Sequence, residues 1–310
     1  MKIDPVTLRS FIAVVEEGSI AAAAARVHLA PSAVSKRIAE LESHLRTELL
    51  IRQHRGIEPT FAGRTLVRHA RNVLRGIDEL VTEIRDFSSG TRGHVRLFAN
   101  ISSITQFLPH DLKSFLTGHP GIDIDLEEHI SSTTTRAVAE NAADIGIYAQ
   151  ADNEYGLEVL PYRRDQLVLA VPPGHELARR KSVNFIDTLN YEFVGLHKGG
   201  AINYLLLRAA SDANRTLKLR FQVTAFEAVI TMVRAGLGIG VLPGGAVNLF
   251  GRDAALRTVR LADAWASRQL KLCVRNRNGL PAAAALLVTH LLREADAFSA
   301  IANRDGGMAK

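Results

Sequence analysis

Apolar side chains recur at helical spacing through the first ninety residues of the chain. An i, i+3, i+4, i+7 pattern predicts a first amphipathic helix, and its members are Leu8, Phe11, Ile12 and Val15. Gly18 breaks this helix, and Ser19 is a favourable N-cap for a second one. The second helix carries the run 21–25, five alanines that form helices readily and add little bulk. The pattern therefore predicts two short helices that can pack closely.

A third helix is predicted to begin at Pro31, because proline is favourable at the first position of a helix. Its apolar stripe is spaced 4, 3 and 4 and comprises Val34, Ile38, Leu41 and Leu45. The opposite side is small, polar and basic, with Ser32, Ser35, Lys36, Arg37 and Ala39. Two short helices joined by three or four residues, the second with such a face, are typical of a helix-turn-helix motif. Lys36 and Arg37 can then reach phosphates or a guanine edge.

Residues 51–60 place apolar ends around a basic turn that contains a glycine, which predicts a short β-hairpin, or wing. Arg52 and Arg55 are expected to bind the DNA backbone. Thr60 is placed to cap the helix that follows. The first sixty residues thus predict a winged helix-turn-helix.

A long helix is predicted over about residues 61–87. Its apolar residues follow the 4, 3 spacing of a heptad seam over three heptads and are Leu66, Ala70, Val73, Ile77, Leu80, Ile84 and Phe87. We interpret the seam as a dimerising coiled coil, with contacts from Leu66, Val73, Ile77, Leu80 and Ile84. The alternative is a helix packed on its own domain, which usually has a wider apolar stripe. A dimer would place two reading heads on one duplex.

Strand-like and helical segments alternate beyond the small, polar stretch at 88–93. The expected strands are 95–99, 122–127, 144–148, 167–171, 193–196, 221–224, 239–243 and 270–274, and the expected helices are 107–116, 137–141, 202–213, 226–235 and 282–298. Such alternation predicts an α/β fold with largely parallel sheets. The fold class is therefore α/β with an all-α N-terminal part.

Composition and charge narrow the classes of function. A length of 310 residues suggests two or three domains. The single cysteine, Cys273, excludes an intrachain disulfide and a thiol pair for redox sensing. No apolar run reaches the roughly 18 residues of a membrane-spanning helix, and the N-terminus lacks a secretory pattern. We therefore expect a protein of the cytoplasm that has no membrane partner.

The positive charge is concentrated in one segment. The chain has 38 Lys and Arg against 32 Asp and Glu, a net charge of +6. Residues 26–75 contain 10 basic and 4 acidic side chains, which is the same net charge. Concentrated positive charge suits a phosphate backbone, since each contact releases counterions. A solvated basic surface is the alternative.

The N-terminal part resembles the LysR-type transcriptional regulators. The matching positions cover about residues 4–66 and include Leu8, Phe11, Val14, Val15, Gly18, Ser19, residues 22–25, Val27, His28, residues 32–35, Ile38, Leu41, Glu42, Leu45, Leu49, Arg52, Pro59, Thr60, Ala62 and Gly63. The resemblance implies that the third helix enters the major groove, the wing meets the minor groove and the long helix pairs two subunits. Pro31 stands where most members carry Gln or a similar polar residue, so base contacts would shift to Ser32, Ser35 and Lys36.

Three further segments extend the resemblance to about residue 300: residues 108–109, 144–147 and 233–243. The resemblance implies two α/β subdomains, as in a periplasmic solute-binding protein, with a ligand between them. The expected boundaries are 1–60 for the winged helix-turn-helix, 61–88 for the linker helix, 89–93 for a hinge, 94–300 for the effector domain and 301–310 for a tail. Within the effector domain, subdomain I is 94–161 with 262–300, and subdomain II is 162–261. The glycines at 236–240 do not form a dinucleotide fingerprint, because a helix precedes them and a strand follows.

Four strand-to-helix junctions are expected to line the effector cleft, since open α/β sheets bind ligands beyond the carboxyl ends of their strands. The candidate effector-binding residues are Asn100, Ser102, Ser103, Ser131, Thr133, His197, Lys198 and Phe226. Hydroxyls, helix N-termini and one lysine favour a small molecule with a carboxylate. The alternatives are that the hydroxyls only cap helices, that His197 and Lys198 are solvated loop residues, and that Phe226 belongs to the core.

No catalytic motif is present: we find no nucleophile elbow, zinc-protease motif or phosphate-binding loop. We therefore predict no enzyme activity, cofactor or metal. The predicted function is sequence-specific transcriptional regulation in the cytoplasm, at the nucleoid. The expected partners are double-stranded promoter DNA, a small-molecule effector, a homodimer or homotetramer, and RNA polymerase as a further candidate. A ligand-binding protein with a basic head, an enzyme on the α/β domain and a nonspecific architectural DNA binder remain the alternatives.

Overall fold

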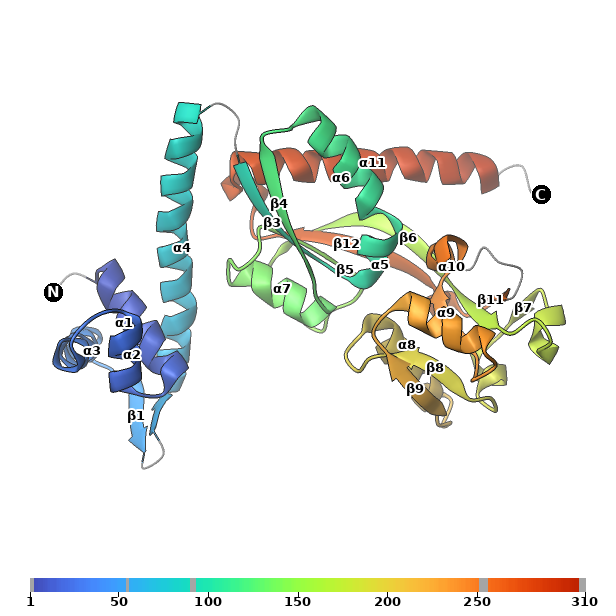
Figure 1. The fold of residues 1–310 in the computed structure, drawn as a ribbon, viewed down its shortest axis with the longest axis horizontal. Coiled ribbons are helices and arrows are strands. Elements are labelled where there is room, and N and C mark those ends of the chain that lie inside the picture. Colours follow the sequence, from blue (N-terminus) through green and yellow to red (C-terminus); the bar gives the residue numbers. More distant parts are fainter. Residues whose placement is uncertain (1–2, 54–55, 90–92, 251–255, 307–310) are drawn as a thin grey trace. The chain divides into compact units, whose positions relative to one another are not determined.

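The chain forms two compact units, Met1–Thr91 and Arg92–Lys310 (Figure 1). The structure is a computed structural model that describes residues 3–53, 56–89, 93–250 and 256–306. No helix in these ranges is both long enough and apolar enough to cross a lipid bilayer.

The first unit contains the predicted helix-turn-helix and hairpin. Its elements are α1 (Pro5–Glu17), α2 (Ile20–Arg26), α3 (Pro31–Leu45), β1 (Leu50–Gln53), β2 (Gly56–Pro59) and α4 (Phe61–Ser89). Gly18 ends α1 in the left-handed conformation, with φ 63°, and the hydroxyl of Ser19 accepts the N–H of Ala22 at 3.5 Å. The local signals for these two helix ends are therefore confirmed.

The three helices enclose a small core built from the expected apolar positions. Phe11, Val34 and Leu41 are fully buried, and the small side chains of Ala23 and Ala24 let α2 pack closely on its neighbours. Leu45 is an exception, because its side chain is exposed. It is the last residue of α3, and Arg46 then turns the chain in the left-handed conformation, so this end of the stripe lies at the surface.

The hairpin is held by backbone contacts to the helical part. β1 and β2 are antiparallel, and the N–H of Ile57 donates to the carbonyl of Gly18 at 2.9 Å. At the start of α4, the Thr60 hydroxyl accepts the N–H of Gly63 at 2.9 Å, as an N-cap does. A Cβ on Gly63 would lie 2.1 Å from the carbonyl oxygen of Leu49, so this crossing of helix and strand requires glycine.

The second unit is an α/β domain, as predicted. Its helices are α5 (Ile101–Gln106), α6 (Leu108–Gly118), α7 (Ser131–Ala139), α8 (Ala201–Asp212), α9 (Phe226–Arg234), α10 (Gly244–Phe250) and α11 (Ala282–Gly306), with four short 3-10 helices at Glu176–Arg179, Phe185–Thr188, Ala264–Ala266 and Arg277–Gly279. Its strands are β3 (Gly93–Ala99), β4 (Ile122–Glu128), β5 (Ile145–Tyr148), β6 (Glu158–Val171), β7 (Ser182–Val183), β8 (Phe193–Leu196), β9 (Leu219–Val223), β10 (Gly240–Pro243), β11 (Arg257–Leu261) and β12 (Ser267–Val274).

The sheets are mixed, so the prediction of largely parallel sheets was wrong. The eight-stranded sheet runs β4-β3-β5-β12-β6-β11-β7, with β10 also paired to β6, and β8 and β9 form a separate pair. β3 is parallel to β4 and β5, but β12, β10 and β11 are all antiparallel to β6. The physical reason is that the chain leaves one half of the domain along β6 and returns along β11 and β12, so outgoing and returning strands run in opposite directions.

The buried apolar residues of the second unit form separate cores in two lobes. In the first lobe, Val95, Leu97 and Leu272 lie under α6 and α11, and α7 covers the opposite face of the same sheet (Figure 1). In the second lobe, Val194 and Val229 pack with apolar residues of β6 and β10. Because β6 contributes to both halves of the mixed sheet, it connects the lobes directly.

Candidate functional site

The outer face of α3 carries the residues expected to contact DNA, but these residues differ in solvent exposure and in the contacts that their side chains already make. Ser32 and Lys36 are exposed, and Ser35 is half-buried. The Nζ of Lys36 lies 3.9 Å from a carboxylate oxygen of Glu40, and the side chain remains largely open to solvent. Lys36 is therefore placed to contact a phosphate.

Arg37 is engaged within its own domain. Its Nη1 donates to Asp4 Oδ2 at 3.3 Å and to the Thr7 hydroxyl at 3.1 Å. Asp4 is the N-cap of α1, so this arginine connects α3 to the beginning of α1. The structure thus gives Arg37 a packing role that the sequence pattern does not show.

The wing residues are only partly described. Arg52 lies in β1 opposite Ile57, and its side chain is outside the described part of the structure. Arg55 lies wholly outside the described residues. The hydroxyl of Thr60 accepts from Gly63 and donates to the carbonyl of Glu48 at 2.9 Å. Thr60 is therefore occupied as a helix cap.

The apolar stripe of α4 is wider than a coiled-coil seam. Val67, Ala70 and Leu74 are buried against the rest of the first unit, and Leu66 packs at the edge of the same core. By contrast, large apolar side chains further along the helix remain exposed in the single chain; they are Val73, Ile77, Leu80 and Val81, with Leu80 62 % exposed. The side chain of Ile84 lies outside the described residues. One face of the helix therefore packs on its own domain, and a second apolar face is left uncovered.

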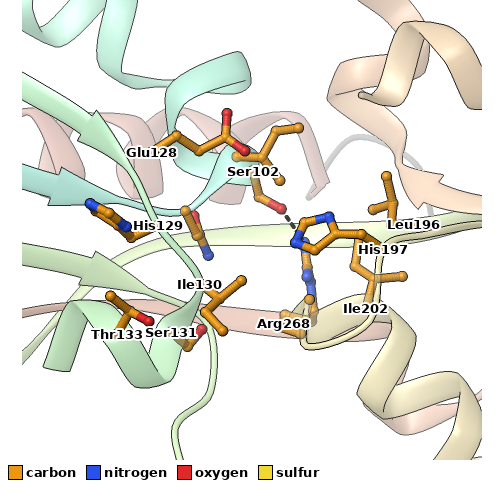
Figure 2. Close-up of a pocket in the computed structure, with 14 residues that line it drawn as sticks. Ser102, Glu128, His129, Ile130, Ser131, Thr133, Leu196, His197, Ile202 and Arg268 are labelled. Carbon is orange, nitrogen blue, oxygen red and sulfur yellow. Dashed lines mark hydrogen bonds between the residues drawn. The ribbon is translucent and has the colours of Figure 1, made fainter. Parts of the chain in front are cut away.

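The second unit contains a cavity of about 250 Å³ between its two lobes. It is lined by Asn100, Ile101, Ser102, Glu128, His129, Ile130, Ser131, Thr133, Leu196, His197, Gly200, Ala201, Ile202 and Arg268. In Figure 2, the side chains of Ser131 and Thr133 face those of His197 and Ile202 across the cavity, and Arg268 lies between the two groups. Three of the four predicted strand-to-helix junctions therefore meet in one place.

Five of the eight predicted effector-binding residues line this cavity: Asn100, Ser102, Ser131, Thr133 and His197. Ser103 is fully buried, and its N–H and hydroxyl both donate to Asn100 Oδ1, at 3.0 and 2.7 Å, so it serves the cap of α5. Phe226 is buried in the core of the second lobe. Lys198 lines a neighbouring cavity.

Arg268 is the most informative residue of the cavity, and the sequence pattern did not single it out. It is 6 % exposed, and its Nε and Nη2 donate to Asp165, with Nε 2.8 Å from Oδ1. Nη2 also donates to the Ser102 hydroxyl at 3.0 Å (Figure 2). Its remaining nitrogen, Nη1, is buried and has no hydrogen-bond partner within the described ranges. A buried guanidinium nitrogen without a partner is costly, because it has lost water and gained nothing in return.

A sequence signal for a buried charge at Arg268 did exist. Arg268 shares the buried face of β12 with Leu270 and Leu272, because side chains alternate along a strand. Asp165 is the residue directly opposite Arg268 on β6. A charged residue in a buried alternating position requires a partner, and the register supplies it.

Two further polar atoms in the cavity wall lack partners among the residues the structure describes: the hydroxyl of Ser131 and Nδ1 of His197. The helices that begin at this cavity, α7 and α8, have Ile130 and Gly200 as N-caps, and no described side chain caps either helix by a hydrogen bond. Their first N–H groups can therefore donate hydrogen bonds to an anion, and the positive ends of the helix dipoles favour its charge. The cavity combines these donors with apolar walls from residues such as Ile202.

Metal and thiol chemistry have little support in the described residues. The one group with metal-ligand spacing there is His110, Asp111 and Glu294. Asp111 is buried and already accepts hydrogen bonds from Arg163 at 2.8 Å and from the Tyr162 hydroxyl at 2.6 Å. Burial raises the pKa of the Cys273 thiol to about 12, so it stays protonated and unreactive at neutral pH.

Comparisons with known proteins match both units to the same family of regulators. Residues 6–64 match the family described as bacterial regulatory helix-turn-helix protein, lysR family, and residues 88–296 match the LysR substrate binding domain. The RuBisCO operon transcriptional regulator of Allochromatium vinosum is 26 % identical over 288 residues, covering 93 % of this chain and 95 % of that protein. An uncharacterised HTH-type transcriptional regulator of Escherichia coli, YbhD, is 27 % identical over 244 residues, or 79 % of this chain and 77 % of its own.

Solved structures share the fold. Full-length CbnR complexed with its target DNA has a TM-score of 0.66 and 22 % identity, and the match covers 94 % of this chain and 99 % of that one. Full-length BenM has a TM-score of 0.58 and 24 % identity, with 96 % and 98 % of the two chains covered. The expected architecture, a helix-turn-helix part followed by an α/β effector domain, is thereby confirmed.

Proposed function

Because this chain belongs to the LysR family of DNA-binding transcriptional regulators, we propose that its effector is a small carboxylate bound at Arg268. The unpaired Nη1 of Arg268 carries the proposal, because it is a buried cationic donor in the wall of the effector-domain cavity. Carboxylates form the strongest hydrogen bonds with guanidinium groups. The uncapped N-termini of α7 and α8 and the hydroxyl of Ser131 would supply further donors.

We further propose that effector binding changes how the two helix-turn-helix domains of a dimer contact promoter DNA. The exposed face of α3, with Ser32, Ser35 and Lys36, would enter the major groove, and the wing with Arg52 and Arg55 would bind the backbone. Ser103, Lys198 and Phe226 are not part of this proposal, since they lie outside the cavity. Coupling between the two sites in such systems is typically about 1–3 kcal/mol. The regulator would act in the cytoplasm at the nucleoid, with RNA polymerase as a partner at the promoter.

The uncovered face of α4 supports the proposal of a homodimer, and of a homotetramer built from two dimers. Val73, Ile77 and Leu80 follow the heptad spacing and are exposed in the single chain. Large apolar side chains in such a row require a partner in water. Leu66 would contribute less than the sequence pattern predicts, because it packs at the edge of its own domain's core.

Isothermal titration with a panel of small organic acids tests the carboxylate proposal. We expect heat from acids with the wild type and a loss of at least tenfold in affinity with Arg268→Gln. Arg164→Gln is the matched control, since Arg164 is an exposed arginine on β6 that binds Gln269 at 3.1 Å. Thermal melting establishes that both variants are folded at the titration temperature. Heat only from neutral or cationic ligands, or equal acid binding by Arg268→Gln, would overturn the proposal.

A further inference from the structure

A second, larger cavity adjoins the one at Arg268. Its volume is about 600 Å³, and it shares three lining residues with the first: Ile130, Ser131 and Ala201. Small-molecule sites commonly have about 300–1,000 Å³. The first cavity alone is below this range, and the second lies within it. The size of the first cavity therefore suits a head group better than a whole ligand.

The second cavity combines a broad apolar wall with polar and charged residues such as Asp152 and Lys198. In its apolar wall, α8 contributes Tyr204 and Leu207, and β9 contributes Leu219. Leu207 is 47 % exposed although it lies in a concave site, and Tyr204 is exposed beside it. Apolar side chains that line a cavity and still meet water gain free energy when an apolar group covers them.

Asn203 is an independent sign that the second cavity binds a ligand. It lines the cavity, its side chain is only 3 % exposed, and its Oδ1 has no hydrogen-bond partner in the described part of the chain. A buried acceptor in this state has lost its water without compensation. A hydroxyl or amide on a bound molecule would supply the missing donor.

The boundary between the cavities is made of side chains that can move or are small. Ile130 packs against Gly199, where the position of an added Cβ would lie 3.3 Å from Ile130 Cδ1. On the other side stands Ala201, the first residue of α8, whose side chain is a single methyl group. A rotamer change of Ile130 would let one ligand reach both spaces.

We propose that the effector is an amphipathic carboxylic acid that occupies both cavities. Its carboxylate binds Arg268 in the first cavity, and its apolar body lies against Leu207 and Leu219 in the second. This inference rests on the proposed carboxylate function and adds the class of acid: short hydrophilic acids fill only the first cavity, and acids with an apolar body of several carbons fill both.

Isothermal titration of the full chain with butanoate, hexanoate, octanoate and 3-phenylpropanoate tests this inference. Each methylene group that enters the second cavity should increase the affinity by about fourfold. Octanoate should thus bind at least tenfold more tightly than butanoate. In Leu207→Asn, which introduces an uncharged polar group, octanoate should lose about tenfold and butanoate should be unchanged.

Leu286→Asn is the matched control, because Leu286 is a similarly exposed leucine on α11 that lines neither cavity. It should bind the whole series as the wild type does. Equal affinity along the series, combined with dependence on Arg268, would overturn the two-cavity inference and leave the carboxylate function standing. Absence of binding by every acid, or binding that does not depend on Arg268, would overturn the carboxylate function itself.

Discussion

Arg268 of β12 and Asp165 of β6 stand directly opposite each other in antiparallel register, and their side chains form a buried ion pair in the wall of the effector cavity. The pair satisfies both carboxylate oxygens of Asp165 and leaves one guanidinium nitrogen available. It thus positions a guanidinium nitrogen between the two lobes, while the charge of Arg268 is balanced by Asp165.

Breaking this pair should destabilise the second unit. Asp165→Leu leaves a buried guanidinium without its counterion, which costs about 3–5 kcal/mol. The double variant Asp165→Leu with Arg268→Met should recover most of that loss, because apolar residues of similar size often replace a buried pair without penalty. Urea unfolding followed by circular dichroism measures both. Equal destabilisation by the single and double variants would show that the pair itself is not the cause.

Substitutions of Lys36 and Arg37 on α3 should have different effects, the first on DNA binding and the second on stability. Lys36→Ala should weaken promoter binding and reduce the log–log salt slope by about one unit, because one phosphate contact is lost, with little change in stability. Arg37→Ala should lower stability by up to about 1 kcal/mol, because its hydrogen bonds to Asp4 and Thr7 are removed. Fluorescence anisotropy at several salt concentrations and thermal melting measure these effects. Lys113→Ala, on α6 of the other unit, is the control for loss of one positive charge.

The exposed face of α4 should control assembly. Leu80→Glu places a charge in the middle of the heptad row and should convert the assembly to smaller species, with weaker binding to a two-half-site operator. Phe61→Glu is the matched control, since Phe61 is an exposed apolar residue of the same helix outside the heptad series. Sedimentation velocity distinguishes the species. An unchanged sedimentation coefficient for Leu80→Glu would show that the heptad row of α4 does not form the interface between subunits.

The stability of the first unit should fall in acid through Glu16. Burial alone would raise the pKa of this carboxyl, but hydrogen bonds from Arg71 at 2.5 Å and from Arg26, together with their charges, lower it overall below its ordinary value of 4.5. A depressed folded-state pKa contributes stability above the unfolded value, and this contribution is lost as pH falls through the folded value.

Glu16→Gln should therefore be less stable than the wild type at pH 7, and the difference should shrink below about pH 4.5. Denaturant unfolding at pH 7, 5, 4 and 3 measures the difference in free energy. Glu40→Gln is the control, because the contact of Glu40 with Lys36 is long and exposed. A difference that stays constant over this range would exclude the Arg71 and Arg26 contacts as its origin.

The sequence by itself determined where most helices begin and end, because those signals are local. The left-handed Gly18, the cap at Ser19 and the proline at the start of α3 each act within one helical turn. Two of the predicted junctions, those after β3 and β4, meet in the cavity because the carboxyl ends of parallel strands meet at one sheet edge. The third, after β8, comes from the separate two-stranded sheet of the second lobe. The start of α7 was placed too late, because the run 131–135 is rich in Ser and Thr, which are poor helix formers. The start of β6 was also placed too late, at residue 167 instead of Glu158.

Only the tertiary structure decided which side chains face the ligand and which are used to hold the fold. Arg268 and Asp165 are 103 residues apart in the chain and meet because of strand register, which no local pattern encodes. Arg37 turned toward Asp4, and Phe226 turned into the core, because packing across elements settles the direction of a side chain. The sequence thus determined the architecture and the family, whereas non-local contacts decided the chemistry of the site.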